Sequence, residues 1–263
     1  MRALALPLLL VASTAGTQLP RAYSYDFRLD PGGKKEKDVI HGTVRVAGGR
    51  ARVDTDQRDQ DHDYLLVGDG GRTVYVVHDD QRTYEQHDAD EFARIIGTAM
   101  RAAGPVFKVS VSDARIDTVR LGAGGTVAGR QTQHVRLRQQ WRTSMRVMGF
   151  VKEDLRGSAT GDYWADPSLV LMRNPLFDIV STSLFALAAS DEEFLASSDA
   201  SRARLFRGAP LKADITFSMG GSDGDDTSHL RYEVTKLTPG AVDERALEIP
   251  KGYRRTSEKT FRM

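Results

Sequence analysis

The stretch Leu169–Leu187, LVLMRNPLFDIVSTSLFAL, is the long segment of this chain whose apolar residues recur at helical rather than strand spacing. Asn174 is a good N-cap, and Pro175 suits the first turn of a helix, where its missing N–H costs nothing. The helical repeat puts one set of side chains on a single face: Leu176, Ile179, Val180, Ser183 and Leu187. We therefore expect a helix that begins at Pro175 and organises the segments around it.

This expected helix carries more apolar surface than one face can bury, because Phe177, Leu184 and Phe185 lie beside the main stripe. Two interpretations follow from an apolar surface of that width. The helix is packed on both sides in a core, or it is a lid whose second side meets a ligand. On the second interpretation the ligand-binding residues of the helix are Leu176, Phe177, Ile179, Val180, Leu184 and Phe185.

The composition restricts the classes of partner and chemistry. The 263 residues carry 37 basic and 36 acidic side chains, a net charge of +1 without a strong block of either sign. Neither nucleic acid nor an anionic membrane is therefore demanded by electrostatics. The absence of cysteine excludes disulfides, thiolate metal ligands, thiol nucleophiles and lipid attachment at a cysteine.

The N-terminus has the pattern of a secretory signal peptide. Met1 and Arg2 form a short basic region, Ala3–Ala12 is apolar, and Ser13–Ala15 supplies the small residues that a signal peptidase reads. The apolar run is shorter than the ~20 residues that span a bilayer. We expect residues 1–21 to be removed on export to the periplasm or the extracellular space, with an uncleaved anchor as the alternative. Residues 22–263 then form a single domain without a membrane span.

The mature chain begins with strand-like alternation. One set of alternate residues is apolar, namely Tyr23, Tyr25, Phe27 and Leu29. Similar short strands, joined by glycine turns, continue to Val77, which indicates an antiparallel sheet with one wet face. A covering helix is expected over Asp88–Ala103, and short strands punctuated by Gly124, Gly125 and Gly157 resume at Phe107. A further helix starts near Ser190, and two strands follow it. The pattern predicts an α+β fold that is mostly β.

Several short motifs occur in a recognisable order. They are Arg50–Asp54 (RARVD) after a glycine turn, Val74–Val76 (VYV), Thr83–Glu85 (TYE), Val127–Arg130 (VAGR), Tyr163–Pro167 (YWADP) and Leu247–Tyr253 (LEIPKGY). Together with the leader, they resemble an exported domain of the lipoprotein-carrier (LolA/LolB-like) superfamily over most of Ala22–Tyr253. The resemblance implies a curved antiparallel sheet, a half-barrel, with helices covering its concave face. It also implies that acyl chains or lipidated proteins are held there, and it implies no catalytic residue.

Two polar segments have the outline of a chemical site but lack its context. Gly220–Gly224 fits the G-x-S-x-G pattern of a nucleophile elbow, but a strand rather than the required helix is expected after Ser222. We interpret it as a hairpin loop. Asp54–Asp63, DTDQRDQDHD, offers carboxylates for calcium, but Tyr64 stands where an EF-hand loop needs glycine. We interpret it as a solvated acidic loop and expect no metal.

The remaining candidates are histidines, arginines and an aromatic pair. The six histidines show no His-x-x-x-His or His-Glu pairing of the kind that zinc sites or hydrolases use. The arginines Arg136, Arg138, Arg142 and Arg146 form a basic stripe, which we interpret as a solvated face. Tyr163 and Trp164 close the sheet as an aromatic corner, stack on a sugar, or cover an apolar pocket.

The sequence therefore leaves two functions open. The first is an exported binding or carrier protein that holds an apolar ligand, a lipid or an acylated protein, between the sheet and a helical lid. Its ligand-binding residues are the six helix residues above together with Tyr163 and Trp164. The second is a cell-envelope sensor or interaction protein with a fully packed core and a protein partner. No coherent nucleophile and base or metal set indicates an enzyme, and no cofactor is expected.

Overall fold

Twelve strands and two α-helices make up the regular structure in the described part of the chain. The computed structural model describes residues 22–32, 38–56, 63–89, 107–147, 151–170, 174–184, 192–205, 209–221 and 224–256. The strands are β1 (Ala22–Asp30), β2 (Ile40–Ala47), β3 (Arg50–Thr55), β4 (Tyr64–Gly68), β5 (Thr73–His78), β6 (Thr83–Asp88), β7 (Phe107–Val127), β8 (Arg130–Val147), β9 (Val151–Ala165), β10 (Lys212–Gly221), β11 (Gly224–Pro239) and β12 (Arg254–Arg255). The helices are α2 (Pro175–Leu184) and α3 (Glu192–Leu205), with short 3-10 turns at Asp69–Gly71 and Glu244–Leu247.

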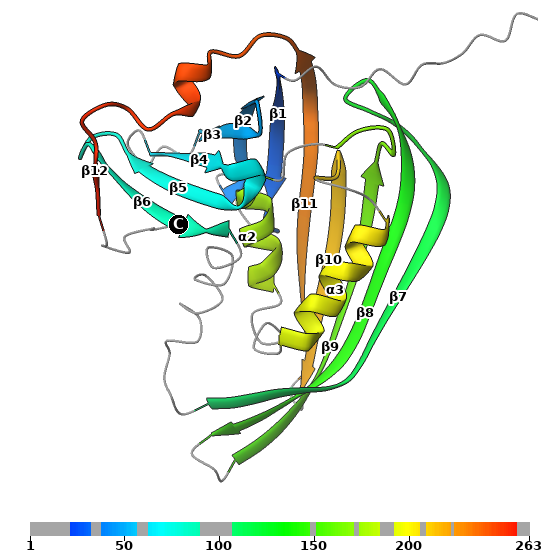
Figure 1. Ribbon diagram of the computed structural model, residues 1–263. Helices are drawn as coiled ribbons and strands as arrows, with labels where there is room; N and C mark the ends of the chain where they lie inside the picture. The colour runs from blue at the N-terminus through cyan, green and yellow to red at the C-terminus, as the bar shows by residue number, and fades with distance from the viewer. Residues whose placement is uncertain are drawn as a thin grey trace, which may run out of the picture.

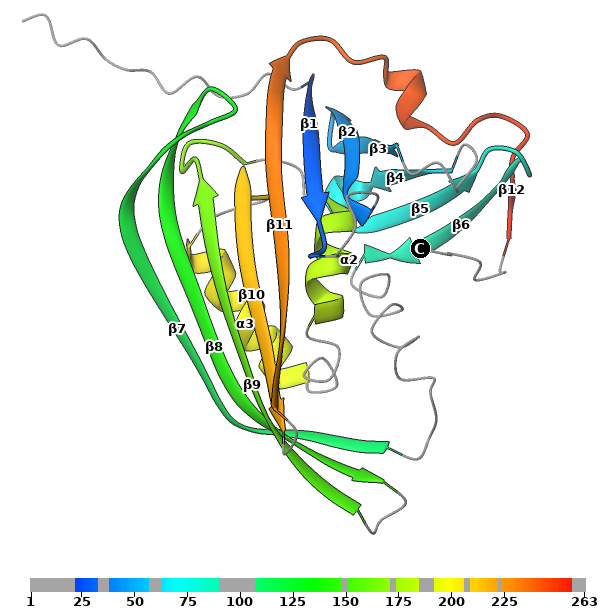
Figure 2. The ribbon, with the colours of Figure 1, turned by 180° about the vertical axis from the view of Figure 1, so that it is seen from behind.

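All twelve strands belong to one sheet, in the order β12-β6-β5-β4-β3-β2-β1-β11-β10-β9-β8-β7. β12 runs parallel to β6, whereas the other described neighbours are antiparallel, so the sheet is mixed. Figure 1 shows the long strands β7 to β11 side by side, with the shorter β4 to β6 running across them at the other end of the sheet. β1 lies between the two groups, as the reverse view also shows (Figure 2).

The alternation predicted for β1 is confirmed. Its residues alternate between half-buried and buried along the whole strand, and the buried set is Tyr23, Tyr25, Phe27 and Leu29. We call the face of the sheet that carries these side chains the inner face and the opposite one the outer face. The main core lies on the inner face and joins residues from both ends of the sheet with residues of α2.

The strands after Phe107 are longer than the sequence suggests. β7, β8 and β9 contain 21, 18 and 15 residues. Polar and glycine positions in β7 suggest strand breaks, but the strand contains bulges there instead. The register between β7 and β8 shifts at Ser112/Arg115, Arg120/Gly122 and Ala123/Gly125. A bulge accommodates one extra residue and lets the ladder continue beyond it.

The predicted half-barrel with helices covering its concave face is wrong. The structure is mostly β, with one 12-stranded mixed sheet, and its two described α-helices are short and form no such cover. Twelve strands about 4.8 Å apart span roughly 50 Å, whereas helices of 10 and 14 residues are only about 15 and 21 Å long. α2 packs against β11, and α3 packs against β7 and β8.

Some predicted segments lie outside the described residues. These are the leader over residues 1–21 and residues 90–103 of the helix expected at Asp88–Ala103. The helix expected near Ser190 is present as α3. No helix in the described part of the chain is both long and apolar enough to cross a membrane.

A small aromatic cluster attaches α3 to the inner face. The ring of Trp141 lies 5.2 Å from Phe194 of α3 and 5.8 Å from Phe217 of β10, between ring centroids. Gln139 donates a hydrogen bond of 2.6 Å from Nε2 to Oγ of Ser198. The indole ring occupies the space that a side chain at Gly157 would need.

We predict that Gly157→Ala destabilises the protein by about 1–3 kcal/mol, the usual cost of overpacking a core. The new Cβ would lie 2.1–2.4 Å from ring atoms of Trp141, so the ring or the strand must move. Gly68→Ala is the matched control, because its Cβ would meet the ring of Tyr75 at an ordinary 3.4 Å. Urea unfolding of the two variants measures the difference, and equal stabilities would contradict the packing argument.

Candidate functional site

The start of α2 is built as the sequence predicts. The side-chain Oδ1 of Asn174 accepts a hydrogen bond of 3.1 Å from the backbone N–H of Leu176. The backbone carbonyl of Asn174 accepts another of 3.1 Å from the N–H of Asp178. Pro175 occupies the first helical position, where no N–H is needed. The cap fixes where Leu176 and Phe177 enter the core.

An aromatic layer holds α2 against the sheet. We define this layer as Tyr25, Phe27, Phe177 and Tyr232. The Phe177 ring lies 4.7 Å from that of Tyr232, which in turn lies 6.0 Å from that of Phe27, between centroids. Phe177 is 2% exposed and Leu176 is 8% exposed. These two predicted ligand-binding residues are therefore buried against β1 and β11.

Phenol groups within this layer remain neutral over the ordinary range of pH. Burial raises the pKa of Tyr25 well above its usual value and also raises that of Tyr232. Burial likewise raises the pKa of Tyr163, which lies on the same inner face. A neutral phenol offers a hydrogen-bonding group within an apolar surface without adding a charge.

The structure separates Tyr163 from Trp164. Tyr163 is buried on the inner face, whereas the ring of Trp164 is stacked on His134 at 4.5 Å on the outer face. The ammonium group of Lys212 lies 5.1 Å from the centre of the Trp164 ring. Of the aromatic pair, Tyr163 therefore shares the face of α2. The side chains of Ile179, Val180 and Leu184, and all of Phe185, lie outside the described residues.

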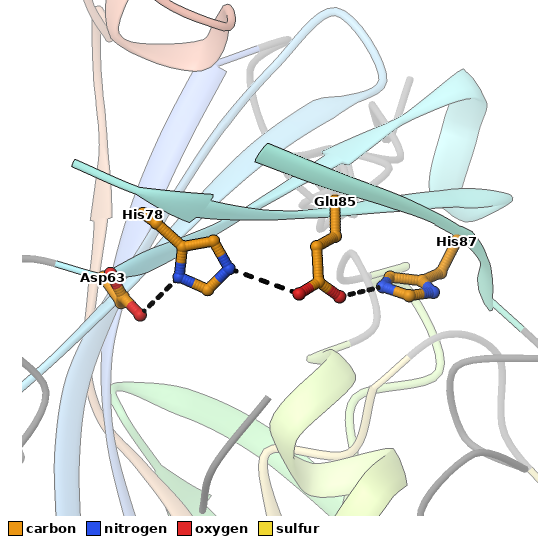
Figure 3. A network of polar contacts seen from close by, with 4 residues as sticks. All are labelled: Asp63, His78, Glu85 and His87. Carbon is orange, nitrogen blue, oxygen red and sulfur yellow. Dashed lines mark hydrogen bonds and ion pairs between the residues drawn. The ribbon is translucent and has the colours of Figure 1, made fainter. Parts of the chain in front are cut away.

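A buried polar network extends this face at β5 and β6. Nδ1 of His78 lies 2.8 Å from Oδ2 of Asp63, and its Nε2 lies 3.4 Å from Oε1 of Glu85. Nε2 of His87 lies 2.9 Å from Oε2 of the same glutamate. Figure 3 shows the four side chains in a row below the two strands. We call Asp63, His78, Glu85 and His87 the polar network.

Both ring nitrogens of His78 face carboxylates, and an ionised carboxylate can only accept hydrogen bonds. The 2.8 Å contact with Asp63 is the shorter and stronger of the two, whereas the 3.4 Å contact with Glu85 is longer than a typical hydrogen bond.

The helical His-x-x-x-His spacing of zinc sites does not identify this network, because its residues lie on strands. Glu85 and His87 are two residues apart, which places both on one face of a strand. His78 follows the buried Val74 and Val76 at the same period, and these valines belong to the same core as Phe177. Period-two pairs of ionisable residues within predicted strands are the signal that would have pointed to it.

The other sequence motifs are described only in part, because residues 57–62 and 222–223 lie outside the described residues. A hairpin connects β10, which ends at Gly221, to β11, which begins at Gly224, so a strand follows the G-x-S-x-G pattern. Asp54 forms ion pairs with Arg45 and Arg52. Within the described residues, no group of three or more His, Asp or Glu side chains is arranged to hold a metal ion. The stripe residue Arg136 is paired with Asp162.

Comparisons with known proteins identify no family for this chain. No protein-family model matches it, and no match was found among curated proteins. The functional interpretation therefore rests on the aromatic layer and the polar network on the inner face.

We predict that Glu85→Gln lowers the free energy of unfolding by about 3–5 kcal/mol, the cost of removing one partner from a buried ionic contact. Glu85 is 2% exposed and bridges two imidazoles. Glu233→Gln is the control, since that carboxylate is half exposed and lies 4.0 Å from Lys212. We expect it to cost no more than about 1 kcal/mol. Chemical unfolding of both variants at one fixed pH measures the difference in stability. Equal losses of stability would contradict a special role for Glu85.

Proposed function

We propose that this chain is an exported binding or carrier protein that holds an apolar ligand, a lipid or the acyl chain of a lipidated protein, at the inner face beside α2. The observation that carries the proposal is the attachment of α2. A ten-residue helix covers the aromatic layer, and the strand ladders on both sides of β1 and β11 are complete without it. Displacing α2 would expose Phe27 and Tyr232 while leaving the strands paired.

The chemistry of the inner face supports an amphiphile. Apolar ligand surface removed from water contributes roughly 25 cal/mol per Å². The neutral phenols of Tyr25 and Tyr232 and the adjoining polar network add hydrogen-bonding groups close to that apolar surface. Binding sites of this kind are mostly apolar and contain a few fixed polar groups. The resemblance of the sequence motifs to the lipoprotein-carrier superfamily points to the same class of ligand.

A second candidate function is an envelope sensor or interaction protein with a fully packed core. The near-complete burial of Leu176 and Phe177 favours it, since residues of this kind already have partners in the absence of a ligand. In that case a protein partner binds elsewhere, and α2 does not move. The two candidates differ in whether ligand uptake depends on Phe177.

We predict that wild-type protein takes up a fluorescent fatty acid and that Phe177→Ala weakens this uptake by about tenfold or more. Such a truncation also costs about 3–5 kcal/mol of stability. Phe194→Ala is the matched control, because Phe194 is equally buried but belongs to the Trp141 cluster under α3. It should lose comparable stability and retain uptake.

The milder Phe177→Leu keeps this comparison interpretable if the alanine variant does not fold. It retains a large apolar side chain, so its effect on uptake can be measured in folded protein. A lipid extract of the purified wild-type protein provides the second measurement. If the wild type takes up no fatty acid and its extract contains no lipid, the packed-core alternative is favoured.

Export is the second part of the proposal. We predict that the mature protein begins between Gly16 and Tyr23 and is found outside the cytoplasm, because the apolar leader is followed by small residues that suit cleavage. N-terminal sequencing of protein from separated cell fractions measures this. Intact Met1 on protein from the cytoplasm would contradict it.

A further inference from the structure

A pocket of about 600 Å³ lies among outer-face side chains of β7 to β10, and Trp141 and Gly157 also contribute to its lining. Its charged lining consists of Arg115 on β7, Arg142 on β8, Arg156 on β9 and the single carboxylate of Asp113. The lining residues from β10 are Ser218 and Gly220. Three guanidinium groups and one carboxylate give the charged lining a net charge of +2.

The strand register explains the hollow. Arg142 pairs with Arg156 on β9, and Arg156 pairs with Gly220 on β10. Glycine has no side chain, so the long Arg156 stands beside an empty position on the next strand. The pocket is therefore formed by small residues on one side and long cationic residues on the other.

A bulge in β7 directs the third arginine to this pocket. The register passes from Ser112 opposite Arg142 to Arg115 opposite Gln140, which inserts one extra residue in β7. Within this bulge Asp113 has a positive φ of 54°. Without the extra residue, Ala114 would stand opposite Gln140. Bulges re-aim side chains in this manner and are common next to functional sites.

Other cross-strand rows of the outer face place positive opposite negative side chains, whereas the row of Arg142 and Arg156 does not. Arg136 donates two hydrogen bonds of 2.8 Å to Asp162, and Arg231 lies 3.6 Å from Asp214. Hydrogen bonds from Arg136 and His134 outweigh the effect of burial and lower the pKa of Asp162. The next arginine on β8, Arg138, stands opposite Asp117 on β7.

The pocket row consists of the cross-strand neighbours Arg142, Arg156 and Gly220, and it places two arginines opposite each other. Like charges in directly opposed positions on neighbouring strands are destabilising. This repulsion is offset only in part by a contact of 3.4 Å between Arg142 and Asp113, two side chains that are 58% and 69% exposed. Within the described residues, no ion pair joins Arg115 or Arg156 to a carboxylate. The next acidic position in the row, Asp225, lies on β11 beyond Gly220.

We propose that this pocket binds an oxyanion of the phosphate type, as a soluble phosphate ester or as the headgroup of a phospholipid. The planar guanidinium fork matches phosphate oxygens in a bidentate manner, and an anion between Arg142 and Arg156 removes their repulsion. The volume accommodates a phosphate together with the group that carries it. This inference stands independently of the inner-face ligand, since the arginines that would bind the anion lie on the opposite face of the sheet.

The test measures binding by titration calorimetry with inorganic phosphate and glycerol phosphate. Sedimentation with vesicles of phosphatidylcholine, either pure or mixed with phosphatidylglycerol, forms the second arm. Arg142→Gln and Arg156→Gln should each weaken the binding of the probe by about tenfold, the effect of one charge-assisted hydrogen bond. Arg138→Gln is the matched control, because it removes the same charge from the same face of β8 outside the pocket. It should leave binding unchanged.

The two arms separate the sources of the anion. Pocket-dependent binding of the soluble probes alone indicates a free phosphate ester, and pocket-dependent sedimentation with the phosphatidylglycerol vesicles indicates a lipid headgroup. Both results support the proposal. Absence of binding in both arms overturns it, and so does an equal loss in Arg138→Gln, which would indicate attraction by overall charge. Circular dichroism of each variant establishes that the exposed substitutions leave the sheet folded.

Discussion

The pairing of β1 with β11 is the constraint on which the rest of the structure depends. It brings Tyr23 opposite Pro239 and Asp30 opposite Arg231, and so joins segments about 200 residues apart in the chain. β1 also pairs with β2, so one strand connects the group β2 to β6 with the group β7 to β11. Closing so long a loop costs entropy, although the cost grows only slowly with length. Buried side chains at the seam offset it, with Phe27 on β1 and Tyr232 on β11 in ring contact.

The same pairing determines which side chains lie on the inner face of the sheet and which lie on the outer face. Alternate residues point to opposite sides, so a slip by one residue would exchange the faces. Along β8 and β9 this alternation puts Tyr163 into the core and leaves Trp164 half-buried on the other face, stacked on His134. The inner face thus gathers the aromatic layer, while the outer face gathers cross-strand ion pairs and the arginine pocket. The bulge at Ser112/Arg115 is a local exception that changes which β7 residues face outward.

The polar network adds a different kind of constraint at the far end of the inner face. Charged groups that leave water need partners, and one unmatched group is costly. Glu85 meets this requirement only if β5 and β6 keep the register that brings His78 and His87 to its two oxygens. Asp63 extends the requirement to the start of β4. An apolar contact would tolerate small shifts among these strands, whereas this set of hydrogen bonds does not.

The sequence by itself determined the features that depend on residues close together in the chain. The alternation of β1, the Asn174 cap, the Pro175 start of α2 and the hairpin after Gly221 are of this kind, because local backbone preferences decide them. The predicted helical cover over a half-barrel was wrong, because strand lengths depend on bulges and pairing across the sheet. The tertiary structure alone decided the polar network and the arginine pocket. Both combine side chains from three or more segments, and no single stretch of sequence specifies which residues of separate strands become neighbours.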